Sequence, residues 1–157
     1  MRHRLVILLL LAAAVGLLSG CSGQRGAYET ITAAEVGDRI REAADLGGMQ
    51  PADAGKLSKT YAIEMNSIAD FVLYTAVSNV EADELAIIKV KDEGETEAVM
   101  DQIRHRVETQ TVKFRDYRPE AYHLIENHVL KATGPFVFFA VSAEAVHMER
   151  AFDEALK

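Results

Sequence analysis

The sequence predicts an α+β domain with a single four-stranded antiparallel sheet and helices packed on it. Apolar residues recur at helical spacing behind polar capping residues in several segments. Four shorter segments are rich in the β-branched and aromatic residues that favour strands. The two kinds of segment follow one another in the order α-β-β-α-α-β-β-α, which favours an antiparallel sheet over alternating β-α units. The strands are expected at residues 71–76, 84–90, 128–133 and 136–141.

The first helix is expected to begin after Thr32, because Thr32 and Glu35 have the spacing of a capping box. Apolar residues then repeat at helical spacing as far as Ala44. The glycine pair Gly47-Gly48 is expected to end this helix, since glycine readily adopts the backbone conformation of a helix C-terminus.

The next segments of the chain have weaker patterns. Residues 47–56 contain Pro51 and are expected to form a loop, whereas residues 57–70 fit either a helical turn or irregular structure. Residues 84–90 are apolar on both faces of a strand, which indicates a central position in the sheet. The last strand, 136–141, is also strongly apolar. If both occupy the centre, the four strands lie in the spatial order 1-2-4-3.

Three helices complete the prediction. Asp92 and Glu95 have the pattern of a helix start, and a long helix is expected from there to about Phe114. Pro119 suits the first position of a short helix that ends near residue 126. Ser142 is expected to cap the final helix.

Composition and charge exclude several classes of protein. The 157 residues are 49% hydrophobic and 26% charged, which is ordinary for a globular domain. A formal net charge of −7 disfavours nucleic acid as a partner, because nucleic-acid binders carry a basic surface. The single cysteine excludes an internal disulfide and an all-cysteine metal cage.

The first 20 residues are expected to be a signal peptide that is absent from the mature domain. Arg2, His3 and Arg4 form a basic start, and residues 5–18 contain no charged side chain. A helix needs about 20 such residues to cross a bilayer, so this run is too short for a comfortable membrane span. Its length matches the apolar region of a secretory signal.

The motif Leu18-Ser19-Gly20-Cys21 resembles a bacterial lipobox. That resemblance implies cleavage before Cys21 and attachment of diacylglycerol to its sulfur. Residues 21–30 would then be a flexible tether, and residues 31–157 a single domain at the extracytoplasmic face of the cell membrane. An ordinary secretory signal and an uncleaved anchor are the two alternatives.

A longer pattern extends over most of residues 30–156. It includes the strand Leu85-Ala86-Ile87-Ile88, Arg106 and Gln110 in the long helix, the corner Phe114-x-x-Tyr117-x-Pro119, and the strand Phe136-Val137-Phe138-Phe139. This pattern resembles a family of small lipoproteins of Firmicutes catalogued as a domain of unknown function, DUF4358. The resemblance implies a lipobox ahead of the domain, and it implies no activity, cofactor or catalytic residue.

Four residues are candidates for binding a ligand or peptide. Tyr117, Pro119 and Tyr122 could line a groove, because exposed aromatic side chains often do so. Arg106 belongs to a locally basic cluster that could dock an anionic partner, together with Arg104, His105, Lys113, Arg115 and Arg118. The alternatives are tyrosines that pack over a helix corner and a solvated helix face whose basic residues match the helix dipole.

The histidines provide no convincing site for a metal ion or for catalysis. His105 with Glu108 and His123 with Glu126 share a helix face, but a metal site needs further ligands. No nucleophile motif or phosphate-binding loop is present in the sequence. We therefore expect neither a metal ion nor a cofactor, and we assign no catalytic residue.

The sequence as a whole favours a lipid-anchored, non-enzymatic module that binds an envelope protein or a small ligand near the membrane. The alternative is a small cell-envelope hydrolase that uses His123 or His128 with nearby carboxylates. A histidine within about 3 Å of a carboxylate inside a concave pocket would favour that alternative. A solute-binding component of a transporter is a third possibility, although such two-lobed receptors are far longer.

Overall fold

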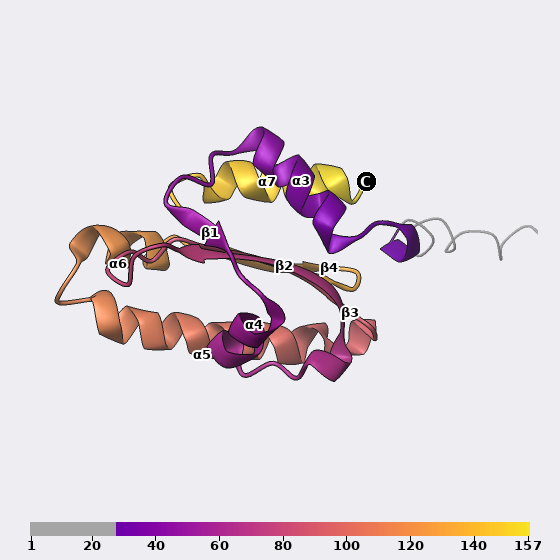
Figure 1. Ribbon diagram of the computed structural model, residues 1–157, viewed down its shortest axis with the longest axis horizontal. Coiled ribbons are helices and arrows are strands. Elements are labelled where there is room, and N and C mark those ends of the chain that lie inside the picture. Colours follow the sequence, from indigo (N-terminus) through magenta and orange to yellow (C-terminus); the bar gives the residue numbers. More distant parts are fainter. Residues whose placement is uncertain (1–27) are drawn as a thin grey trace, which may run out of the picture. The chain divides into compact units, whose positions relative to one another are not determined.

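The computed structural model describes residues 28–157 (Figure 1). The chain divides into two units, Met1–Thr30 and Ile31–Lys157, and the second unit contains the folded domain. The predicted signal peptide, the motif Leu18-Ser19-Gly20-Cys21 and most of the predicted tether lie outside the described residues.

The domain contains one antiparallel sheet, as predicted, but the sheet has five strands. Its order is β1-β2-β3-β5-β4, and every neighbouring pair is antiparallel. The four predicted strands keep their expected relative order within it. The strands are β1 (Met49–Pro51), β2 (Ile68–Ala76), β3 (Glu84–Val90), β4 (Val129–Thr133) and β5 (Phe136–Val141).

The prediction of four strands was wrong because residues 47–56 do not form only a loop. Met49 pairs with Ala76 and Pro51 with Tyr74, so these three residues extend the sheet beside β2. Proline lacks an N–H group and is therefore confined to edge positions such as this one. A strand of three residues is too short to produce an alternating pattern, and the edge of β2 is what makes it a strand.

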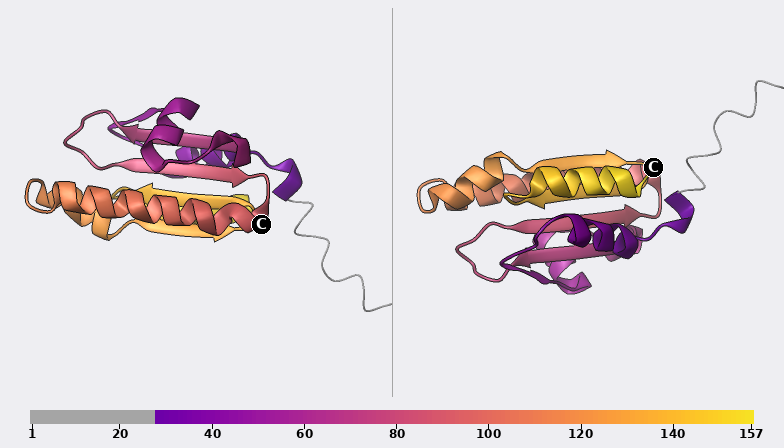
Figure 2. Two further views of the ribbon diagram at one scale, coloured as in Figure 1. Left: turned by 90° about the horizontal axis from the view of Figure 1, so that it is seen from below. Right: turned by 90° about the horizontal axis from the view of Figure 1, so that it is seen from above.

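Helices cover both faces of the sheet (Figures 1 and 2). Helices α3 and α7 lie side by side on one face, and the long helix α5 crosses the other face together with α4. Helix α6 follows α5 and packs against it. The helices are α3 (Ala33–Ala43), α4 (Ala54–Tyr61), α5 (Thr96–Phe114), α6 (Pro119–Glu126) and α7 (Ala145–Ala155).

The predicted capping box of the first helix is confirmed, but the predicted helix end is wrong. The Thr32 hydroxyl accepts a hydrogen bond from the Glu35 amide at 3.1 Å, and the Glu35 carboxylate accepts one from the Thr32 amide at 2.8 Å. Helix α3 ends at Ala43, because Ala44 already has an extended backbone. Gly47-Gly48 instead form the turn that leads into β1.

Two other predicted caps start turns ahead of their helices. The Asp92 carboxylate accepts a hydrogen bond from the Gly94 amide, which begins a short 3₁₀ turn, and α5 follows from Thr96. The Ser142 hydroxyl accepts one from the Glu144 amide, and α7 begins at Ala145. The predicted helix start at Pro119 is confirmed.

The central strand β3 contributes to the core on both sides of the sheet, as its apolar pattern predicts. Ala86 and Ile88 belong to the cluster that lies under α4 and α5. Ile87 faces α3, where a Cβ atom added at Gly37 would lie 3.6 Å from it and 3.2 Å from Val72. Gly37 therefore permits the close approach of α3 to the sheet. On the same face, the rings of Phe138 and Phe152 join β5 to α7, 4.9 Å between centroids.

Candidate functional site

A buried carboxylate links three elements at one end of the sheet. Glu84 is the first residue of β3, and its side chain lies on the same face as Ala86 and Ile88, towards α4 and α5. Only 4% of the residue is exposed, so its charge requires partners. The Tyr61 hydroxyl at the end of α4 donates a hydrogen bond to one carboxylate oxygen. The Arg106 guanidinium of α5 donates to the other at 2.9 Å.

The surroundings of this network keep Tyr61 protonated. Burial, together with the neighbouring Glu84 carboxylate, raises the pKa of the Tyr61 phenol well above its ordinary value of 10.0. The ring of Tyr61 packs edge-on against Phe139 in the core, with 6.3 Å between centroids. Its hydroxyl therefore acts as a hydrogen-bond donor whose position is determined by the fold.

Gln110, one turn after Arg106, supports the guanidinium. With its amide oxygen turned towards Arg106, Gln110 accepts a hydrogen bond from Nη2 at 2.7 Å. A guanidinium carries five N–H donors, so its position between Glu84 and Gln110 leaves it able to donate to a further group. The network therefore links three side chains in a row, and Arg106 within it can still donate a hydrogen bond to a further group.

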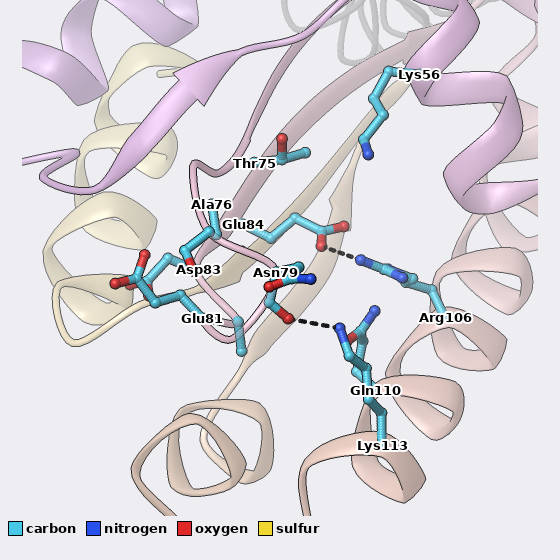
Figure 3. Close-up of a pocket in the computed structure, with 12 residues that line it drawn as sticks. Lys56, Thr75, Ala76, Asn79, Glu81, Asp83, Glu84, Arg106, Gln110 and Lys113 are labelled. Atoms are coloured by element: carbon cyan, nitrogen blue, oxygen red, sulfur yellow. Dashed lines mark hydrogen bonds and ion pairs between the residues drawn. The ribbon is translucent and has the colours of Figure 1, made fainter. Parts of the chain in front are cut away.

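A cavity of about 230 Å³ lies beside this network (Figure 3). Basic side chains from two helices reach it, namely Lys56 of α4 and Arg106 and Lys113 of α5. The Lys113 ammonium donates to the main-chain carbonyl of Asn79 at 2.9 Å, which joins α5 to the β2–β3 connection. The remaining lining residues are Thr75, Ala76, Ser78, Asn79, Glu81, Ala82, Asp83, Glu84 and Gln110.

The acidic residues of the β2–β3 connection face a second cavity. In Figure 3 the carboxylates of Glu81 and Asp83 point away from the three basic side chains. Both residues also line a neighbouring cavity of about 330 Å³, together with Asp45 and Glu144. Burial, and to a lesser extent the charge of Glu81, raises the pKa of Asp83. Among residues 28–157, no group of three or more His, Cys, Asp or Glu side chains is arranged to hold a metal ion.

Three of the four residues predicted to bind a ligand lie at the corner between α5 and α6, and Arg106 lies apart from them. Tyr117 is 70% exposed and Pro119 is exposed at the corner between α5 and α6. Tyr122 is half-buried against the core beneath that corner, and the adjacent Glu126 carboxylate raises the pKa of its phenol. Arg106 lies about 12 Å before the end of α5, at 1.5 Å per residue. Of the four, Arg106 alone lines the cavity beside Glu84.

The basic cluster predicted on the long helix is divided between two faces. Arg104 pairs with Glu97 at 2.7 Å and with Asp101 on the exposed side of α5. Arg106 instead points inward to Glu84, and Lys113 reaches the β2–β3 connection. The sequence cluster is therefore no single docking surface, and two of its members belong to the cavity.

The histidines lie apart from the cavity. His128 contacts the main-chain oxygen of Ile125 at 2.7 Å and packs against Phe139, while His123 contacts Asn127. Within the described part of the chain, neither forms a hydrogen bond or ion pair with a carboxylate. His147 lies 2.8 Å from Glu144, but its side chain is 58% exposed. His105 and Glu108 are 3.6 Å apart on the solvated face of α5.

The sequence alone does not predict that Glu84, Tyr61 and Lys56 contribute to one site. Glu84 did carry a signal, because it occupies the same strand face as Ala86 and Ile88 and is the one charged residue on that face. Tyr61 and Lys56 lie at the edges of segments that had no clear periodicity. Nothing in the local sequence connects them with Glu84, because the contact arises only when α4 packs beside β3.

Comparisons with known proteins identify one match. A protein-family model described as a domain of unknown function (DUF4358) matches residues 42–142, which include all the residues that line the cavity. No curated protein and no solved structure matches the chain. Within residues 28–157, none of the helices has the length and apolar character needed to cross a membrane.

Proposed function

The chain belongs to the DUF4358 family of domains of unknown function, and we propose that it is a lipid-anchored, extracytoplasmic module that binds a small polar ligand. The sequence before the domain supports the anchor, and the cavity beside Glu84 supports the binding role.

The observation that carries the anchoring proposal is the motif Leu18-Ser19-Gly20-Cys21 directly after an apolar run. Cys21 is the only cysteine of the chain, so its acylation would leave no free thiol. Two acyl chains provide a stable anchor, since each buried methylene contributes about 0.8 kcal/mol. We therefore place the protein at the outer face of the cell membrane.

The charge of the proposed mature protein favours attachment through the lipid alone. Removal of residues 1–20 takes away Arg2 and Arg4, so 17 − 2 = 15 basic residues remain against 24 acidic ones, a net charge of −9. A domain of this charge is repelled by anionic headgroups. The domain would therefore hang from its tether and leave its surface free for ligands.

The binding role rests on the construction of the cavity. Its polar side chains come from α4, α5 and the β2–β3 connection, and the ion pair between Glu84 and Arg106 holds two of these elements together. Preorganised hydrogen-bonding groups in a concave site are typical of small-molecule recognition. A ligand would meet a wall whose donors are already in position.

The anchor is tested by Cys21→Ser with Ser22→Ala as the control. We expect the wild-type protein and the control in the membrane fraction, with a mass that lacks residues 1–20 and includes added acyl chains. Cys21→Ser should lack the acyl mass and leave the membrane fraction. A natural product that retains Met1, or a Cys21→Ser protein that stays firmly membrane-bound without acyl mass, would contradict the proposal.

The non-enzymatic part of the proposal has its own test. The purified full chain is incubated with cell-wall fragments and with nucleotides, and the products are followed by mass spectrometry. We expect no turnover above that of a heat-inactivated control. Turnover by the wild type that is lost in His123→Ala or His128→Ala would contradict the non-enzymatic proposal and support the hydrolase alternative.

A further inference from the structure

The cavity and the point where the chain enters the domain lie at opposite ends of the sheet. At the first end, the Ile31 carbonyl accepts a hydrogen bond from Lys89 near the end of β3, and the Ala33 amide donates to Asp70 near the start of β2. At the other end, Ala76 closes β2 and lines the cavity. The six residue-to-residue steps from Asp70 to Ala76 span about 20 Å at 3.3 Å per residue.

Three basic and three acidic side chains line the cavity, but among the described residues only Arg106 of the basic ones is paired with a carboxylate. The two oxygens of Glu84 are occupied by Tyr61 and Arg106. Lys113 donates to a neutral carbonyl, and the Lys56 ammonium forms no hydrogen bond or ion pair with any residue from 28 to 157. Glu81 and Asp83 line this cavity and the neighbouring one, and in Figure 3 their carboxylates point away from the lysines. Two ammonium groups therefore face this space without a carboxylate partner.

Two ammonium groups without a carboxylate partner, in a protein of net charge −7, indicate an anionic ligand. The volume of about 230 Å³ suits a small group. Lysine ammonium groups and a guanidinium are the side chains that most often hold phosphate. Together they match a doubly charged group better than a single carboxylate.

We propose that the cavity beside Glu84 binds the phosphate group of a small water-soluble ligand, with Lys56 and Lys113 as the main contacts and Arg106 as a further donor. This inference deepens the proposed binding role and rests on it. The tether would join the domain at the opposite end of the sheet from the cavity, and the mature protein of net charge −9 would be repelled by anionic headgroups. The phosphate would accordingly come from a soluble molecule and not from a lipid headgroup.

The test measures binding of inorganic phosphate and of glycerol phosphate to the full chain in non-ionic detergent, by calorimetry and by NMR. Lys56→Gln and Lys113→Gln should each weaken binding about tenfold, as expected for loss of one charge-assisted hydrogen bond. Lys59→Gln, which removes a lysine one turn away on α4 that does not line the cavity, should change affinity less than about twofold. Thermal unfolding of each variant verifies that the fold is retained.

A parallel measurement uses vesicles of phosphatidylglycerol, with phosphatidylcholine vesicles as the reference. We expect binding of the soluble phosphates and no preference for the anionic vesicles by the Cys21→Ser chain. The inference is overturned if neither soluble phosphate binds, if Lys59→Gln weakens binding as much as Lys56→Gln, or if only the anionic vesicles bind. The fractionation of Cys21→Ser does not depend on phosphate binding. Failure of this inference can therefore be distinguished from failure of the proposed anchor.

Discussion

At the scale of single residues, the most constrained group of the site is the Glu84 carboxylate. Its removal from water costs several kcal/mol, and the donors from Tyr61 and Arg106 offset that cost. A buried ion pair of this kind contributes little net stability compared with apolar packing. Removal of only one partner is strongly destabilising, because the other charge is then buried without compensation. Glu84 thereby ties α4, β3 and α5 together and holds one wall of the cavity in place.

Glu84→Gln should lower the free energy of unfolding by about 3 kcal/mol, because Arg106 and Tyr61 would then face an uncharged amide. Glu97→Gln is the matched control, since it removes a Glu–Arg pair whose carboxylate side chain is 70% exposed. That control should leave the free energy of unfolding nearly unchanged. Urea denaturation followed by circular dichroism measures both, and equal losses in the two variants would contradict the role of burial.

The raised pKa of Tyr61 predicts a pH dependence of stability. The unfolded chain ionises this phenol near pH 10.0, whereas the folded domain keeps it protonated. The contribution of Tyr61 is therefore fully present below about pH 10 and is lost as the pH rises through the higher folded value. Between about pH 9 and 11, the free energy of unfolding should fall more steeply in the wild type than in Tyr61→Phe. Parallel slopes for the two proteins would refute this assignment.

At the scale of elements, the start of α3 has unusually complete hydrogen bonding. Thr32 and Glu35 satisfy each other's amides, and the Ala33 amide donates to Asp70 of β2 at 2.7 Å. The first amides of a helix have no partner within the helix, so each of these contacts replaces water. The Asp70 contact also fixes α3 to the point where β2 shifts its register with β3.

Thr32→Ala should destabilise the domain by about 1 kcal/mol, the usual effect of losing a side-chain cap. Thr32→Ser retains the hydroxyl and should recover most of that loss. Amide hydrogen exchange provides the local measurement, because the amides of Glu35 and its neighbours should exchange faster in the alanine variant alone. Unchanged exchange at Glu35 would show that the capping contact contributes nothing.

At the scale of the whole domain, the sheet separates two apolar layers that share its central strands. On one side, Phe152 of α7 packs on Phe138 of β5, and both rings are fully buried. On the other side, Ile103 of α5 belongs to the cluster that includes Ile88 and Phe139. Because β3 and β5 contribute to both layers, loss of packing on one side weakens the support of the other.

Phe152→Ala and Ile103→Ala should each destabilise the domain by about 3 to 4 kcal/mol through the cavities they create. Both variants should still unfold in a single transition with the wild-type dependence on urea. Far-ultraviolet circular dichroism and tyrosine fluorescence should give the same midpoint in each protein. An intermediate that retains half of the helical signal in Phe152→Ala would show that the α3–α7 layer unfolds independently.

Much of the architecture follows from local patterns in the sequence. The capping box at Thr32, the proline at the start of α6 and the two apolar faces of β3 each depend on residues close together in the chain, and the structure contains all three. The lipobox-like motif that ends at Cys21 is likewise local, and its role stays a prediction. The acidic net charge and the presence of a single cysteine follow from the amino-acid composition alone.

The rest was decided by contacts between distant parts of the chain. Strand β1 exists because the free edge of β2 offers hydrogen bonds to three residues whose own pattern is that of a loop. The site joins Glu84 to Tyr61 and Arg106, which are 23 and 22 residues away. The basic residues of α5 also lie on different faces of the helix. Arg104 and Arg106 are two residues apart, which places them on roughly opposite sides at 3.6 residues per turn. Periodicity specifies which face of an element is buried, but only the packed structure determines which polar groups meet beneath it.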